Sequence, residues 1–224
     1  EQLVRHQVES YNDFISRQIP NTIEMFNPVH IASEHDYNKE LGKYSLEIIV
    51  TFDNFGIYRP QIHENNGATK LMFPHEARLR NFSYASNMTL NMNIKYLIRT
   101  GEKLENLQTI YKVLPKIHIG KIPIMLKSSI CLLSQYKHLS HKETGECMMD
   151  PGGYFIINGS EKTCLGQEKA ADNKIYVFKN KKNAKWSYSA EMRCVPYWKV
   201  ISPKQIYMMI HTKPEKSGYP IYIT

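Results

Sequence analysis

The sequence predicts an α+β fold, a mixed and mostly antiparallel sheet with one long amino-terminal helix. Two periodicities support this prediction. Apolar residues recur at three- and four-residue steps over residues 3–19, the pattern of an amphipathic helix, and Pro20 is expected to end that helix. Over residues 44–52 and 83–96 apolar and polar residues alternate instead, which is typical of strands with one buried face.

A β-hairpin is predicted in the middle of the chain. Residues 150–153, Asp-Pro-Gly-Gly, have the composition of a tight turn. The apolar run 154–157 then reads as a buried strand. Asn158-Gly159 favours a two-residue turn, since both central positions of a type I′ turn need a positive φ. The returning strand is expected over residues 162–166.

Shorter patterns predict the remaining strands, at residues 107–114, 174–178, 186–194, 205–211 and 220–224. Gly120 and Pro123 interrupt the apolar segment 118–124, which is therefore expected to be an edge strand or a loop. A basic loop at 180–185 precedes a new alternating segment. We therefore predict two domains, residues 1–178 and residues 179–224.

Composition restricts the function classes. Lys and Arg total 29 against 21 Asp and Glu, and the net charge of +8 suits a polyanionic partner such as nucleic acid. No apolar run approaches the ~18 residues of a transmembrane helix, so no membrane contact is expected. Four scattered cysteines without a CxxC pair predict free thiols in a reducing compartment: Cys131, Cys147, Cys164 and Cys194.

Known catalytic and metal-binding patterns are missing from the sequence. There is no Gly-x-Ser-x-Gly, His-Glu-x-x-His, phosphate-binding loop or Asp-x-Asp-x-Asp grouping, so no catalytic residues are expected. His138, His141 and Cys147, with Cys131 nearby, lack the spacing of zinc fingers. We therefore predict no metal site in this chain.

Three charged residues lie close together at Glu76, Arg78 and Arg80. On a helix, Glu76 and Arg80 share one face and form a structural ion pair, because they are four residues apart. A phosphate contact is the functional alternative. A second basic group mixes cations with aromatic residues, which suits single-stranded nucleic acid, although an exposed loop is the simpler interpretation: Lys174, Lys179, Lys181, Lys182, Lys185, Trp186 and Tyr188.

Three stretches resemble a known family. They are GGYFIINGSEK at residues 152–162, PHEARLRN at 74–81 followed by Tyr84, and IGKIPIMLKS at 119–128. In this order they resemble the second-largest subunit of multisubunit DNA-directed RNA polymerases, in its eukaryotic, archaeal or large-DNA-virus form. The resemblance is to the amino-terminal protrusion region of that subunit, which runs on into a truncated lobe domain.

The resemblance implies a role in DNA-templated transcription. The chain would form a wall of the DNA cleft, as a part of a nucleotidyltransferase that is inactive alone. Mg²⁺ would be held by another subunit. Implied partners are the largest and other polymerase subunits, the DNA template, the RNA–DNA hybrid and initiation factors. The implied location is intracellular: the nucleus for a cellular eukaryote, and the cytoplasm or virion for an archaeon or a virus.

The resemblance also indicates which residues would contact nucleic acid. It brings the return strand of the hairpin, with Lys162, Gln167 and Lys169, near the RNA–DNA hybrid. Lys121 and Lys127 flank the matched stretches and suit contacts to a phosphate backbone. Two alternatives stay open. One is a stand-alone basic nucleic-acid-binding module. The other is a secreted glycosylated β protein, since Asn-x-Ser/Thr triplets begin at Asn81, Asn87 and Asn158.

Overall fold

The computed structural model describes residues 2–181, 184–199 and 201–224, and it forms two compact units, Glu1–Leu165 and Gly166–Thr224. The domain boundary predicted between residues 178 and 179 falls inside strand β11 (Ile175–Lys179). This strand pairs with β12 (Trp186–Cys194) in the second unit. The alternating pattern at 174–178 identified a strand but contained no information about its hydrogen-bonding partner.

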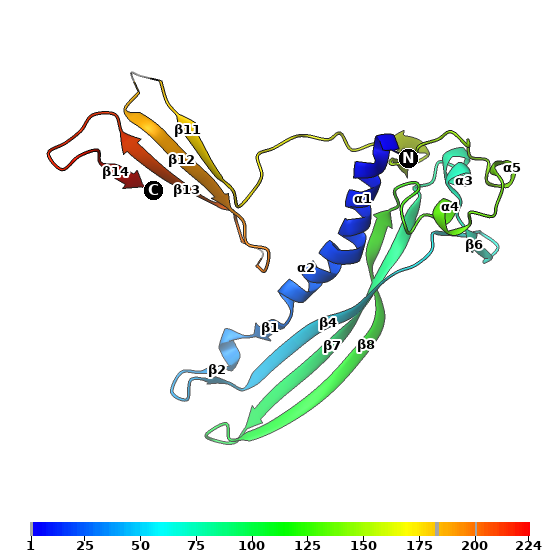
Figure 1. The fold of residues 1–224 in the computed structure, drawn as a ribbon. Coiled ribbons are helices and arrows are strands. Elements are labelled where there is room, and N and C mark those ends of the chain that lie inside the picture. Colours follow the sequence, from blue (N-terminus) through cyan, green and yellow to red (C-terminus); the bar gives the residue numbers. More distant parts are fainter. Residues whose placement is uncertain (1, 182–183, 200) are drawn as a thin grey trace. The chain divides into compact units, whose positions relative to one another are not determined.

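The first unit is built on a long antiparallel sheet in the order β1-β4-β7-β8 (Figure 1). Its strands are β1 (Val29–Ala32), β4 (Leu46–Ile57), β7 (Ala85–Thr100) and β8 (Asn106–Pro123). The predicted strands at 44–52, 83–96 and 107–114 are confirmed within β4, β7 and β8. Residues 118–123 form the end of β8, an edge strand as expected from its glycine and proline, and Ile124 follows it.

The amino-terminal helix is longer than predicted. It comprises a 3₁₀ turn (Gln2–Val4), α1 (Arg5–Asp13), a π-helical turn (Phe14–Gln18) and α2 (Ile19–Phe26). The expectation that Pro20 ends the helix is wrong. Proline lacks the N–H that an inner α-helical position requires, but Pro20 lies in the first turn of α2, where no such donor is needed.

Small elements complete the first unit. Two short hairpins pair β2 (Tyr37–Asn38) with β3 (Lys43–Tyr44) and β5 (Gln61–His63) with β6 (Thr69–Leu71). The second hairpin encloses a turn at residues 65–67, in which Gly67 has a positive φ of 83°. Four short helical segments lie in the connections: a 3₁₀ turn (Glu34–Asp36), α3 (Pro74–Leu79), α4 (Leu132–Gln135) and α5 (His141–Thr144).

The predicted central hairpin is confirmed. Asn158 and Gly159 have φ values of 50° and 78°, as a type I′ turn requires, and they join β9 (Phe155–Ile157) to β10 (Ser160–Lys162). The return strand starts earlier than the predicted 162–166, because a two-residue turn pairs Ser160 directly with Ile157. Beyond Lys162 the chain leaves the ladder, and Leu165 is 90% exposed.

The amino-terminal helix packs one face against this hairpin and the end of the sheet. Tyr11, Ile15 and Met125 are buried together, with Ile122 and Phe155 at their edge. Tyr11 Oη donates a hydrogen bond of 2.6 Å to the Pro123 carbonyl, and burial raises the pKa of Tyr11 to about 12. Only part of the apolar stripe of residues 3–19 faces the core, since Leu3 is 85% exposed and Phe14 41% exposed.

The second unit is one antiparallel sheet in the order β11-β12-β13-β14. Its last strands are β13 (Lys204–His211) and β14 (Ile221–Ile223), which confirm the predictions at 205–211 and 220–224. The basic loop 180–185 is the connection of the β11–β12 hairpin rather than a linker between two β units. Lys182 in this loop lies outside the described residues.

Candidate nucleic-acid interface

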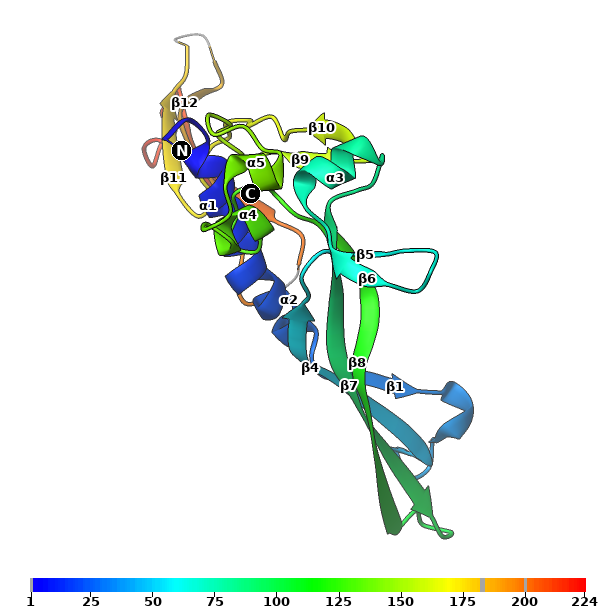
Figure 2. The same ribbon diagram turned by 90° about the vertical axis from the view of Figure 1, so that its right-hand side faces the viewer.

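The three stretches that carry the family resemblance meet in one core. Tyr84 N–H donates to the Ile156 carbonyl and its carbonyl accepts from Ile124 N–H, each at 2.9 Å. Their side chains are fully buried together with Ala77 of α3 and Leu126. Figure 2 shows α3 beside β9 and β10. A hairpin fixed in this way presents its exposed side chains from a rigid support.

Tyr84 is the polar centre of this core. Its hydroxyl accepts a 3.0 Å hydrogen bond from Leu132 N–H and lies 3.5 Å from Cys131 Sγ. Burial, followed by the Cys131 sulfur, raises the pKa of Tyr84 well above its usual range. The hydroxyl therefore stays neutral, and it satisfies the first backbone donor of α4.

Arg78 connects α3 to the central hairpin. Its guanidinium donates to Glu146 at 2.6 Å, to Glu161 at 2.8 Å and to Tyr154 Oη at 2.6 Å. The Tyr154 hydroxyl in turn donates to Asp150. Since acceptors of the protein occupy all three guanidinium nitrogens, this geometry supports a structural role rather than the phosphate contact.

Arg80 has a similar arrangement. It donates two hydrogen bonds to Glu64, at 2.6 and 2.9 Å, and it lies 3.1 Å from Glu76. Lys70 Nζ lies 2.6 Å from the same Glu76 carboxylate. The hydrogen bonds from Arg80 lower the pKa of Glu64 to about 2, and those from Lys70 first and Arg80 next lower the pKa of Glu76.

Lys127 differs from the other candidate lysines because its ammonium is engaged within the fold. Nζ donates to the Asp150 carbonyl in the turn that precedes the hairpin. A Cβ at Gly152 would lie 2.9 Å from Lys127 Cβ, so the two segments are in close contact. The side chain is half-buried. Its position supports the turn.

Lys121 and Lys162 are exposed and lie along neighbouring grooves. Lys162 on β10 lines an apolar groove of about 320 Å³ together with Phe155. Lys121 on β8 lines a second groove of about 560 Å³. Pro123 and Ile157 line both grooves. The first unit therefore brings these two cations to opposite sides of one apolar ridge.

Gln167 and Lys169 belong to the second compact unit, whereas Lys162 belongs to the first. Both are exposed, and Lys169 Nζ lies 3.3 Å from Asp172 Oδ2. In the same unit, Lys174 lies over the ring of Tyr176 at 5.5 Å and Lys185 over that of Trp186 at 4.8 Å. These cation–aromatic pairs stabilise a hairpin of the second sheet.

The candidate zinc ligands are not brought together. Among residues 2–181, 184–199 and 201–224, no three His, Cys, Asp or Glu side chains form a group suited to a metal ion. Cys131 lies in the core, whereas Cys147 and Cys164 are exposed. No helix in the described part of the chain is long and apolar enough to cross a membrane.

Sequence reasoning missed Glu64, Glu146 and Glu161 as partners of the two arginines. Glu64 is 16 residues from Arg80, and Glu146 and Glu161 are 68 and 83 residues from Arg78. No local spacing signals such pairs, because only the folded chain brings these segments together.

The sequence is similar to that of known polymerase subunits. A family model described as RNA polymerase beta subunit matches residues 2–205. DNA-directed RNA polymerase II subunit 2 of Arabidopsis thaliana is 37% identical over 193 residues, 85% of this chain and 16% of that protein. Subunit Rpo2N of Methanothermobacter thermautotrophicus is 38% identical over 175 residues, 78% of this chain and 30% of that protein. A probable RPB2 homolog of Invertebrate iridescent virus 6 is 34% identical over 192 residues, 80% of this chain and 15% of that protein.

These matches define the class of protein as a subunit of multisubunit DNA-directed RNA polymerase. The chain belongs to the RNA polymerase beta subunit family, and it corresponds to the amino-terminal region of the second-largest subunit. It covers between 15% and 30% of the length of the relatives named above. The matches favour neither a stand-alone binding module nor a secreted glycoprotein.

Proposed function

We propose that this chain forms part of a wall of the DNA cleft in a DNA-directed RNA polymerase. It supplies a shaped and positively charged surface, while nucleotide addition takes place on Mg²⁺ held by another subunit. The first unit is the amino-terminal part of the protrusion and the second begins the lobe. Its partners are the largest and other polymerase subunits, the DNA template, the RNA–DNA hybrid and initiation factors. Such an enzyme works inside the cell.

One observation carries this proposal: Lys162 is exposed on a hairpin that is fixed in the core formed by the three family motifs. A rigid support favours binding, because little conformational entropy is lost when the side chain meets its ligand. Lys121 lies beyond the same apolar ridge. Contacts from such lysines go to phosphates and carry no sequence preference. The net charge of +8 adds attraction at longer range.

The geometry ranks the candidate residues. Lys121 and Lys162 have no ion-pair partner among the described residues, whereas Lys127 is bound to the Asp150 carbonyl and Lys169 to Asp172. We therefore propose Lys121 and Lys162 as the principal phosphate contacts. Lys127, Gln167 and Lys169 remain weaker candidates. Glu76 and Arg80 maintain the support of the hairpin.

The test uses the assembled polymerase with Lys121→Ala and Lys162→Ala combined. Binding of an RNA–DNA hybrid scaffold is measured over a range of salt concentrations. Each phosphate contact contributes about 0.9 to the slope of log K against log salt, so the double variant is expected to reduce that slope by about two. The control removes the same charge at Lys179 and Lys181, both exposed in the second unit.

A slope reduced by the control pair but not by Lys121 and Lys162 would assign the nucleic-acid surface to the second sheet instead. The isolated chain is expected to make no RNA when mixed with template, nucleoside triphosphates and Mg²⁺. Template-dependent synthesis by the pure chain would contradict the assignment of catalysis to another subunit.

A further inference from the structure

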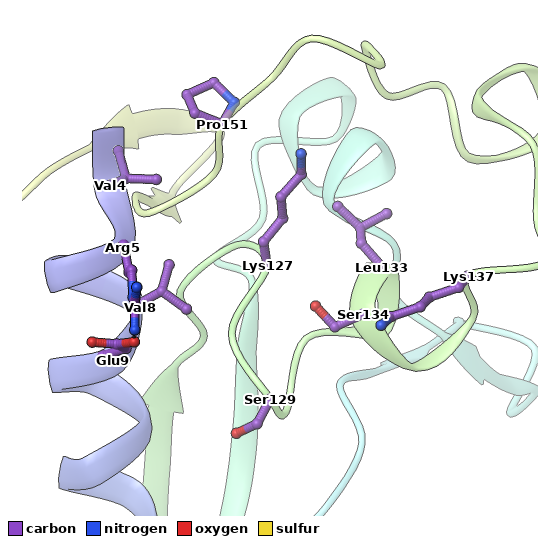
Figure 3. Close-up of a pocket in the computed structure, with 10 residues that line it drawn as sticks. All are labelled: Val4, Arg5, Val8, Glu9, Lys127, Ser129, Leu133, Ser134, Lys137 and Pro151. Carbon is purple, nitrogen blue, oxygen red and sulfur yellow. Dashed lines mark hydrogen bonds and ion pairs between the residues drawn. The ribbon is translucent and has the colours of Figure 1, made fainter. Parts of the chain in front are cut away.

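A groove of about 920 Å³ lies between α1 and the segment around α4 (Figure 3). Neither Lys121 nor Lys162, the two principal phosphate contacts proposed above, lines this groove. Val4, Val8 and Leu133 supply apolar surface. Its polar side chains include Arg5, Lys127 and Lys137.

The walls of this groove are held in place by contacts within the fold. Ser129 N–H donates to Asn12 Oδ1 at 2.9 Å, which attaches the groove's lower edge to α1. A Cβ at Gly153 would lie 2.8 Å from Val4 Cβ, so the turn before β9 is in close contact with the helix. A groove whose walls are fixed in this way binds a ligand with little reorganisation.

The charge of the groove is positive. Arg5, Lys127 and Lys137 line it against a single carboxylate, Glu9, which lies 2.6 Å from Arg5. Within the described residues Lys137 takes part in no ion pair, and the residue is exposed. A ligand with a negative charge near Lys137 therefore gains attraction that the protein itself does not already supply.

The side chains that line the groove indicate which of two polyanions it suits, single-stranded nucleic acid or an acidic polypeptide. Single-stranded nucleic acid is bound by cations together with aromatic side chains on which bases stack. The described residues that line this groove include no aromatic side chain. Aliphatic surface between cations suits a polypeptide that carries leucine-like side chains between carboxylates.

We propose that this groove is a docking site for an acidic, leucine-rich polypeptide segment of a partner protein. Leucine-like side chains contact Val4, Val8 and Leu133, and a carboxylate pairs with Lys137. The site is separate from the nucleic-acid surface proposed above, because it shares neither Lys121 nor Lys162 with that surface. Either assignment stands if the other fails.

The test measures the fluorescence anisotropy of a labelled hexapeptide of alternating glutamate and leucine, titrated with the full 224-residue chain. Lys137→Glu is expected to weaken binding about tenfold, since it replaces an attraction with a repulsion. Lys103→Glu makes the same charge change in the exposed loop between β7 and β8 and is expected to leave binding unchanged. Thermal unfolding monitored by circular dichroism verifies that both variants are folded.

Two further probes identify the chemistry. The first probe is a labelled peptide of glutamate and serine, which lacks the apolar side chains. The second is a labelled oligothymidylate, which replaces the polypeptide with nucleic acid. Both are expected to bind more weakly than the glutamate–leucine peptide. The proposal is overturned if the glutamate–leucine peptide does not bind. It is equally overturned if Lys103→Glu weakens binding of the peptide as much as Lys137→Glu does. The third contradicting result is an oligothymidylate that binds more tightly than the glutamate–leucine peptide and depends on Lys137.

Discussion

Tyr84 and Cys131 are 47 residues apart in the sequence, yet the tyrosine hydroxyl lies 3.5 Å from the cysteine sulfur and both side chains are completely buried. The same hydroxyl accepts the hydrogen bond from Leu132 N–H. One side chain thus joins the connection between α3 and β7 to the beginning of α4. The core made by the family motifs depends on this buried polar contact.

Tyr84→Phe is expected to lower the free energy of unfolding by about 1–3 kcal/mol, because it leaves the buried Leu132 N–H without an acceptor. Urea denaturation of the purified chain measures the change. Tyr58→Phe is the control, since Tyr58 is 44% exposed, and its effect should stay within about 0.5 kcal/mol. Equal effects of the two substitutions would show that the hydroxyl of Tyr84 contributes no specific stabilisation.

Gly159→Ala is expected to destabilise the chain more than Gly67→Ala. Both glycines have positive φ, 78° and 83°, so each substitution costs about 1–2 kcal/mol of backbone strain. At Gly159 a Cβ would also lie 2.5 Å from Asn81 Oδ1 and 2.9 Å from Asn81 Cα, whereas at Gly67 it meets nothing within 4 Å. Urea midpoints that shift equally in the two variants would contradict a close contact between the hairpin turn and residue 81.

Glu64→Gln is expected to reduce the acid sensitivity of the chain. The folded-state pKa of Glu64 is lowered from 4.5 to about 2 by Arg80, so this carboxylate stabilises the fold above pH 4.5. That contribution is lost as the pH falls towards 2. The difference in unfolding free energy between wild type and Glu64→Gln should therefore shrink over this range. Glu102→Gln, at an exposed loop carboxylate, is the control, and a difference that stays constant from pH 5 to pH 2 argues against the Arg80 interaction.

The cysteines are expected to differ in their reaction with a thiol reagent. Cys147 and Cys164 are exposed and should react rapidly in the native chain, whereas Cys131 is buried and should react only on unfolding. After denaturation without reductant, four thiols should be counted. A lower count would indicate a disulfide and would revive the secreted alternative.

Local patterns in the sequence predicted most elements of this fold. Alternation located β4, β7 and β8, and Asn158-Gly159 located the turn of the central hairpin, because these signals depend on nearby residues alone. The end of the helix was predicted wrongly, since a π-helical turn has no clear sequence signature. The partners of Arg78 and the engagement of Lys127 depend on contacts between distant segments, which no local pattern contains.

The π-helical turn at Phe14–Gln18 links the number of residues in the amino-terminal helix to the presence of Pro20. Such a turn holds one residue more than an α-helical turn. Deleting one residue there would restore a continuous α-helix and leave α2 beside β4, where Asn27 makes two hydrogen bonds to the backbone of Phe52. The straightened helix would also bring Pro20 to an inner position, where a proline is unfavourable. A homologue that lacks the additional residue is therefore expected to lack the proline as well.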